Sequence, residues 1–98
     1  YPEMKLWQTE QECGDGKNNL DYAVYAWGLL NHYLNSGASA YMYWNTSLVD
    51  GGISRWGWAQ NSLVVVNDKN KTFRYTLEYY ILVQFAKVSS LDIYDEFL

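Results

Sequence analysis

The stretch LDYAVYAWGLLNHYLNSGASAYMYWN, residues 20–45, decides the fold, because a helix pattern is followed at once by a strand pattern. Asp21 suits the first turn of a helix, and Gly37 stands where a left-handed residue commonly ends one. The sequence therefore predicts a helix near residues 19–35 and a buried strand near residues 38–45. The apolar stripe of that helix comprises Leu20, Ala23, Trp27, Leu30 and Leu34.

The sequences on either side of this stretch extend the pattern in both directions. MKLWQTE, residues 4–10, predicts a first strand. After a long aromatic loop, SLVVV and TFRY surround the polar turn NDKNK and predict a hairpin. TLEYYILVQFAKV predicts a second helix near residues 77–89, with Thr76 as its cap, whereas the tail at 90–98 has no clear period.

The order strand, helix, strand, hairpin, helix indicates an α/β fold. Both principal strands lack the polar alternation of a half-exposed sheet, which is typical of parallel strands buried on both faces. A right-handed strand–helix–strand unit follows, but two strands alone do not make a stable sheet. The sequence therefore predicts two consecutive βα units of a larger sheet or (β/α)8 TIM barrel, with a small hairpin before the final helix.

The composition supports the same interpretation. Aromatic residues make up 18% of the 98 residues, with five Trp and ten Tyr. A domain of this size buries only about 60–65% of the surface that its unfolded chain exposes. We therefore expect large exposed apolar areas on several aromatic side chains, namely Trp7, Trp27, Tyr41, Tyr43 and Tyr79.

Charge and motif content exclude several classes of function. The net charge of −4 and the scattered basic residues disfavour a nucleic-acid partner. No apolar run approaches the roughly 20 residues that span a bilayer, so a transmembrane protein is not predicted. His32 stands without partner ligands, and Asp15-Gly16 lacks the later oxygen ligands of a calcium loop. We therefore predict neither a metal site nor a cofactor.

An acid and an indole stand at the ends of the two principal strands. Glu10 ends the first strand and Trp44 lies at the end of the second, each with the parity of its strand's inward-facing set. In a barrel, both side chains would face the mouth where the chemistry takes place. An indole offers a flat apolar platform for a pyranose, and a carboxylate can attack the anomeric carbon. From spacing alone, a solvated acid and a core indole are the simpler interpretation.

Three blocks of sequence in order add to this pair. WQTEQECGDG, HYLNSGASAYMYWN and GGISRWGWAQNSLVVV resemble the carboxyl-terminal part of the catalytic barrel of glycoside hydrolase family 30, over residues 6–88. That family includes glucosylceramidases, β-glucosidases, β-1,6-glucanases and some xylanases. The resemblance implies a retaining β-glycosidase in which residues 1–89 match the seventh and eighth βα units of the barrel. The tail at 90–98 departs from the family pattern, which leaves the side domain of that family in doubt.

The resemblance also implies roles for particular residues. Glu10 matches the nucleophile, Trp44 matches an aromatic wall of the sugar subsite, and Trp58 belongs to a loop that borders the cleft. Glu12 is more simply a loop acid, and Cys13 a buried small residue. The acid/base glutamate of the family belongs to a region that these 98 residues do not contain.

The implied substrate is a β-linked sugar, in a glycolipid or a glucan, and the implied compartment is secreted or lysosome-like. The remainder of the barrel would come from the same gene product or from another chain, and these residues alone would be inactive. Two alternatives stay open: a carbohydrate-binding chain without chemistry, and a structural piece that needs a partner chain.

Overall fold

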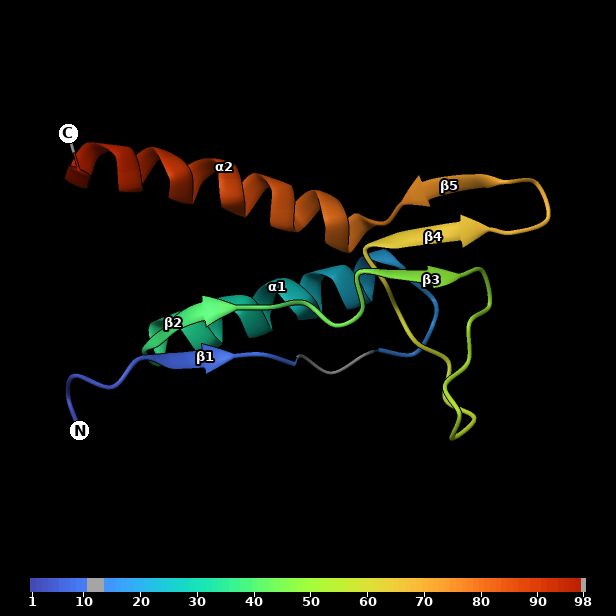
Figure 1. Cartoon of the computed structure of the whole chain (residues 1–98), viewed down its shortest axis with the longest axis horizontal. Helices are drawn as coiled ribbons and strands as arrows, with labels where there is room; N and C mark the ends of the chain where they lie inside the picture. The colour runs from blue at the N-terminus through green and yellow to red at the C-terminus, as the bar shows by residue number, and fades with distance from the viewer. Residues whose placement is uncertain (11–13, 98) are drawn as a thin grey trace.

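A computed structural model describes residues 1–10 and 14–97, and the side chains up to residue 89. The chain contains seven elements in this part (Figure 1). Listed in order, they are β1 (Leu6–Gln8), α1 (Leu20–Asn35), β2 (Ala38–Tyr41), β3 (Ser47–Val49), β4 (Val64–Asn67), β5 (Thr72–Tyr75) and α2 (Leu77–Phe97).

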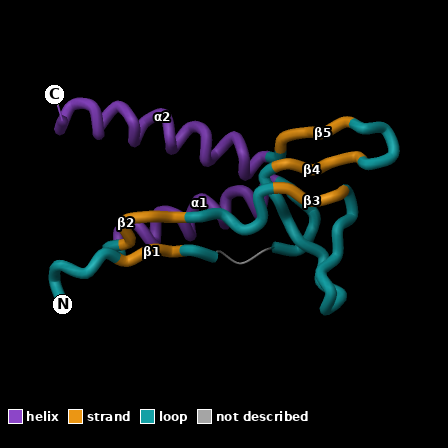
Figure 2. Tube along the Cα trace, in the orientation of Figure 1, coloured by secondary structure: helices purple, strands orange, loops and turns teal. Residues whose placement is uncertain are grey.

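The strands form two separate sheets at opposite ends of the molecule (Figure 2). β1 and β2 pair in parallel, which confirms the predicted pairing of the two principal strands. β4 lies in the middle of the second sheet, parallel to β3 and antiparallel to β5. The hairpin is therefore confirmed, whereas β3 lies in a segment that the sequence pattern predicted as part of a loop.

The prediction of a (β/α)8 barrel fragment is wrong. Such a barrel is built from one continuous parallel sheet in which each strand is followed by a helix. Here the parallel pair β1–β2 is not hydrogen-bonded to the second sheet, and the second sheet is mixed. α2 follows the antiparallel strand β5, not a parallel strand. The described residues therefore form two helices and two small sheets, and a parallel strand pair alone did not justify a barrel.

The ends of α1 follow the predicted local chemistry. The Asn19 side chain accepts a hydrogen bond from the backbone N–H of Tyr22 at 3.0 Å, which caps the helix. Gly37 has φ +95°, the left-handed conformation that was expected after the last turn. The predicted buried stripe is only partly correct, because Ala23 and Leu30 are buried whereas Leu20 is exposed.

The other element boundaries differ from the predicted ones: two strands are shorter and the second helix is longer. β1 and β2 are shorter than the predicted strands at residues 4–10 and 38–45, because their pairing ends with Gln8 and Tyr41. α2 begins where expected but continues to Phe97, so the tail after residue 89 is helical.

No helix within residues 1–10 and 14–97 combines the length and the apolar character that crossing a bilayer requires.

The interior of the chain is unusual because as much of it is polar as apolar. The buried apolar residues are Ala23, Ala26, Leu30 and Val65. Four polar residues are equally buried, and we call them the polar junction: Asn61, Ser62, Thr76 and Glu78. They lie where the segment leading into β4 meets the start of α2. Three of the apolar residues lie on α1, which packs against β2 and α2, and Val65 lies on β4.

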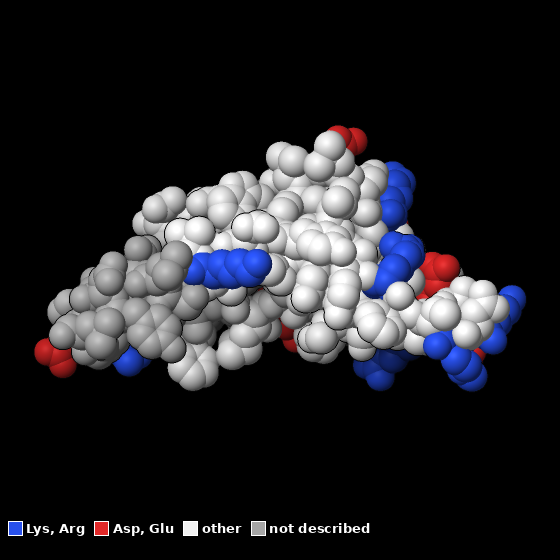
Figure 3. All heavy atoms as spheres, turned by 90° about the horizontal axis from the view of Figure 1, so that it is seen from above, with Lys and Arg blue, Asp and Glu red and all other residues white. Residues whose placement is uncertain are grey.

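The surface is correspondingly rich in apolar side chains. Trp7 is 61% exposed and Trp27 is 40% exposed, as the composition predicted, whereas Tyr41, Tyr43 and Tyr79 are half-buried. Figure 3 shows a face on which uncharged atoms predominate and the Lys and Arg side chains lie mostly toward one end. The chain thus buries small and polar groups while large rings remain at the surface.

Candidate functional site

Two of the three predicted site residues, Glu10 and Trp44, lie just beyond the carboxyl ends of the parallel strands β1 and β2. The backbone N–H of Met42 donates to the Gln8 carbonyl at 2.8 Å, which closes the ladder at this edge. Glu10 lies two residues beyond Gln8 and Trp44 lies two residues beyond Met42. The segments that follow β1 and β2 therefore leave the sheet side by side and in the same direction.

Glu10 is exposed at this edge, and its carbonyl oxygen accepts a hydrogen bond from the Gln8 side-chain amide. Trp44 is 46% exposed, so the simpler interpretation of a core indole does not hold for it. Glu12 and Cys13 lie outside the described residues.

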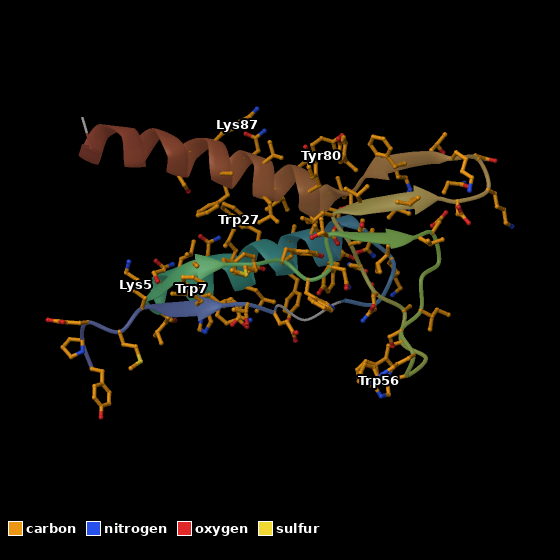
Figure 4. The ribbon with its side chains drawn as sticks, in the orientation of Figure 1. Lys5, Trp7, Trp27, Trp56, Tyr80 and Lys87 are labelled. Atoms are coloured by element: carbon orange, nitrogen blue, oxygen red, sulfur yellow. The ribbon has the colours of Figure 1, made fainter. Side chains whose placement is uncertain are left out.

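Trp58 lies on a separate loop, residues 51–60, which hangs from the second sheet in Figure 1. Its ring packs against that of Trp56, at a centroid distance of 5.9 Å and an interplanar angle of 33°. Both indoles are more than 60% exposed, and Figure 4 places Trp56 at the tip of the loop. The Arg55 guanidinium lies 4.3 Å from the centre of the Trp56 ring, a cation–π contact.

A network of hydrogen bonds around Ser54 holds this aromatic pair in place. The Ser54 hydroxyl oxygen accepts from the backbone N–H of Trp56 at 3.3 Å and of Trp58 at 3.2 Å. The backbone N–H of Ser54 donates to the Trp58 carbonyl at 2.8 Å, and Ile53 pairs with Ala59 below the turn. The loop therefore presents two indoles on an ordered backbone, which suits a flat apolar face of a ligand.

The polar junction connects this loop to the two strand ends. Asn45, which directly follows Trp44, accepts a hydrogen bond from the backbone N–H of Leu63 at 3.1 Å. Its side-chain amide donates to the Asn61 carbonyl at 3.5 Å. The backbone N–H of Gly16, beyond the end of β1, donates to the Asn61 side-chain oxygen at 2.7 Å. Asn61 thus touches the segments that follow both strands.

The sequence analysis did not single out Asn61. It forms its contacts with partners 45 and 17 residues away, Gly16 and Glu78. Glu78 lies in the first turn of α2. A local pattern contains no signal for such a pair, because the contact exists only after α2 has packed onto the segment before β4.

The electrostatics near the site are mild. The side chain of Lys17 forms an ion pair with Asp15 at 3.0 Å, and this hydrogen bond lowers the pKa of the Asp15 carboxyl and raises that of the Lys17 amine. Both side chains are exposed, so the pair contributes little to stability. Burial, with smaller contributions from Tyr22 and Tyr33, raises the pKa of the Tyr41 phenol.

The part of the chain that the structure describes contains no cluster of metal-binding side chains. Within residues 1–10 and 14–97, no three His, Cys, Asp or Glu side chains lie close enough together to hold a metal ion. His32, the residue considered from the sequence, packs edge-on against the Tyr33 ring at 5.9 Å.

Comparison with known proteins gives one structural likeness. No protein-family model matches the chain, and no curated protein matches it. The chain resembles a solved structure described as the crystal structure of SrfJ from Salmonella typhimurium, with a TM-score of 0.67 and 21% sequence identity. The likeness covers 82% of this chain and 19% of SrfJ, so the chain spans about a fifth of the length of that protein. At this identity the likeness concerns the arrangement of the backbone alone.

Proposed function

We propose that the chain carries the nucleophile of a retaining β-glycosidase, with Glu10 as the nucleophile and Trp44 as a wall of the sugar subsite. The supporting observation is that each residue lies two positions beyond the last hydrogen bond between the parallel strands β1 and β2, Glu10 after Gln8 and Trp44 after Met42. An exposed carboxylate beside an exposed indole offers an attacking group and an apolar platform for one pyranose. The sequence resemblance to glycoside hydrolase family 30 supports the same assignment.

The proposed reaction is a double displacement. A Glu10 carboxylate oxygen attacks the anomeric carbon, the glycosidic C–O bond breaks, and a covalent glycosyl–enzyme forms. Water then opens the ester and restores the carboxylate. The leaving oxygen of a natural substrate needs a proton from a second carboxyl, roughly 5–5.5 Å from the first. The proposal takes that second carboxyl from another polypeptide segment, so natural substrates are not turned over by these residues alone.

The tip of the loop at residues 51–60 supplies a second platform in this proposal. Trp58 and its neighbour Trp56 present their rings on an ordered turn, which suits the next sugar of a glucan or the remainder of a glycolipid. A β-linked sugar is thus the proposed substrate class, and the loop would set what lies beyond the first sugar.

The test uses a probe that needs no proton donor. A dinitrophenyl β-glucoside with fluorine next to the anomeric carbon has a leaving group that departs as a stable anion. Attack by Glu10 would release one equivalent of dinitrophenolate, and mass spectrometry of the peptides would find the fluorosugar on Glu10. Glu10→Gln should abolish both signals, because the amide is a poor nucleophile, whereas Glu12→Gln serves as the matched control and should retain them.

Two results of this experiment would contradict the proposal. A label on Glu12, or a label that persists in Glu10→Gln, would move the nucleophile to another residue. Binding of the sugar without any label in the wild type would leave carbohydrate binding without chemistry.

An assembly role is a second candidate, and the size of the surface favours it. The chain exposes 7528 Å², whereas a compact monomer of 11.5 kDa exposes about 5,800 Å², a difference of roughly 1,700 Å². Its radius of gyration is 15.4 Å, against about 13 Å for a compact domain of this length. An open apolar groove of about 430 Å³ between α1 and α2 contributes to this surface, with Trp27 pointing into it in Figure 4. Another polypeptide that covers these surfaces would stabilise the chain.

Assembly predicts that stability depends on protein concentration or on an added partner chain. The measurement is urea denaturation at several protein concentrations, followed by circular dichroism. A midpoint that rises with concentration supports self-association, and a midpoint that rises only with a partner supports a hetero-complex. A midpoint that responds to neither would exclude this role.

A further inference from the structure

The centre of the polar junction is a buried chain of two hydrogen bonds that connects α2 to the loop after β1. The Asn61 side-chain amide donates to Glu78 Oε1 at 2.8 Å, and the other end of the same side chain accepts from the backbone N–H of Gly16 at 2.7 Å. Asn61 is 0% exposed and Glu78 is 1% exposed. Neither residue can exchange its partner for bulk water without opening the structure.

Glu78 determines which way the Asn61 amide points. A carboxylate oxygen only accepts hydrogen bonds, so the amide N–H₂ must face Glu78 and the amide oxygen must face away from it. The oxygen then meets the Gly16 N–H, which is a donor. The reverse orientation would set oxygen against oxygen and nitrogen against nitrogen.

The backbone packs tightly around the Asn61 side chain. A Cβ placed on Gly14 would lie 2.6 Å from Asn61 Cγ, and one on Gly16 would lie 2.7 Å from the Ala59 Cβ. Both glycines also have positive φ, +79° and +82°. The loop at residues 14–18 is therefore shaped to lie directly on residues 59–61, and the amide is held on that side by backbone.

Two short connections link Asn61 to the proposed sugar site. Residues 59–61 directly follow the turn that carries Trp56 and Trp58. The Asn61 carbonyl accepts from the side chain of Asn45, the residue after Trp44. A rotation of the Asn61 side chain would therefore release the Gly16 N–H in the loop after β1, whereas the contact to Asn45 is made by the Asn61 backbone.

One oxygen of the buried Glu78 carboxylate makes no hydrogen bond to the described residues. Among the described residues, no donor lies within hydrogen-bond distance of Glu78 Oε2, although the atom is buried. Burying a carboxylate with half of its accepting capacity unused costs stability, and an apolar residue would avoid that cost. Such a residue suits a role in placing another group more than a role in packing.

We propose that Glu78 is a positioning residue for the sugar site, acting through the orientation of the Asn61 amide. The proposal rests on the proposed glycosidase function for its ligand. Glu78 itself touches no substrate in this arrangement; it orients the amide that holds the Gly16 N–H in the loop after β1, on the residue whose backbone carbonyl binds Asn45 beside Trp44.

A swap of the two functional groups tests the pair. In Asn61→Asp two carboxylates face each other, so the hydrogen bond between positions 61 and 78 should be lost. In the double variant Asn61→Asp/Glu78→Gln, the new amide at position 78 donates to the new carboxylate at position 61, which still accepts from Gly16. Glu78→Gln alone keeps an acceptor for Asn61 and should lie between the wild type and Asn61→Asp. Asp68→Asn, in the exposed turn between β4 and β5, is the control.

Two measurements are made on each variant. Hydrogen exchange of the Gly16 amide, without sugar, should be about tenfold to a hundredfold faster in Asn61→Asp and should return close to the wild-type rate in the double variant. The affinity for cellobiose, followed by tryptophan fluorescence with maltose as the α-linked control, should fall and recover in parallel. Losses that add in the double variant would show that the two residues do not act as a pair.

The outcomes separate the two proposals. If the wild type binds cellobiose and the double variant is as weak as Asn61→Asp, the positioning role is overturned. If the exchange rate recovers in the double variant but cellobiose affinity does not, the pair holds the loop without serving the site, and the positioning role is again overturned. If the wild type does not bind cellobiose, the positioning role is overturned, whereas the fluorosugar label on Glu10 decides the proposed function separately.

Discussion

The polar junction and the β1–β2 sheet differ in the kind of side chain that each one buries. At the junction, Asn61 and Glu78 are almost completely buried and joined by a hydrogen bond. In the sheet, large apolar side chains such as Trp7 remain at the surface. Hydrophobic burial normally dominates the stability of a folded chain, so this distribution is the reverse of the usual one. The difference teaches that order at the junction is set by hydrogen bonds and close backbone contact, whereas the sheet face is available for a partner or a ligand.

The largest effect is expected at a glycine of the junction. Gly14→Ala places a methyl group 2.6 Å from Asn61 Cγ at a positive φ, so overpacking adds to backbone strain. We expect a loss of about 2–4 kcal/mol in the free energy of unfolding, measured by urea denaturation. Gly57→Ala is the matched control, because it has a similar φ of +83° with nothing within 4 Å of the new methyl group.

The control should lose only about 1 kcal/mol, the cost of a left-handed alanine. Equal losses in Gly14→Ala and Gly57→Ala would break the comparison, since contact with Asn61 would then contribute nothing. A larger loss in Gly14→Ala than in Gly57→Ala would show that the contact with Asn61 adds to the backbone cost that both variants share.

The smallest effect is expected at the sheet. Trp7→Ser removes a large ring that is mostly solvated in the chain by itself, so the free energy of unfolding should change by no more than about 0.5 kcal/mol. The same denaturation experiment measures it. If a partner covers the sheet, the substitution should instead weaken that complex. A loss of several kcal/mol in the chain alone would show that Trp7 is packed and that the sheet face is not open.

Local features of the fold follow from short stretches of sequence. The start of α1, its glycine at position 37 and the β4–β5 hairpin all depend on residues close together in the chain. Each of these expectations was confirmed, because capping, positive φ and a polar turn act over a few residues. The parallel pairing of β1 and β2 was also confirmed, since a helix connects two apolar runs.

The larger architecture did not follow from the same patterns. Apolar strands without alternation predicted burial on both faces, yet β1 is largely exposed and its sheet has two strands. The short segment at Ser47–Val49 contains too few residues for a readable period, but it pairs with β4 over its whole length. Strand order and sheet membership depend on partners distant in sequence, and this is why the barrel prediction failed.

The sequence by itself determined the position of α1, the start of α2 and the β4–β5 hairpin, and that an acid and an indole stand near the ends of two parallel strands. Only the tertiary structure decided that these ends lie side by side, and that Trp58 is paired with Trp56 on another loop. It also decided that Asn61 lies between Gly16 and Glu78, partners separated from it by 45 and 17 residues. The physical reason is range: caps, turns and side-chain periodicity act between near neighbours, whereas a buried hydrogen bond between distant residues exists only once the elements that carry them have packed.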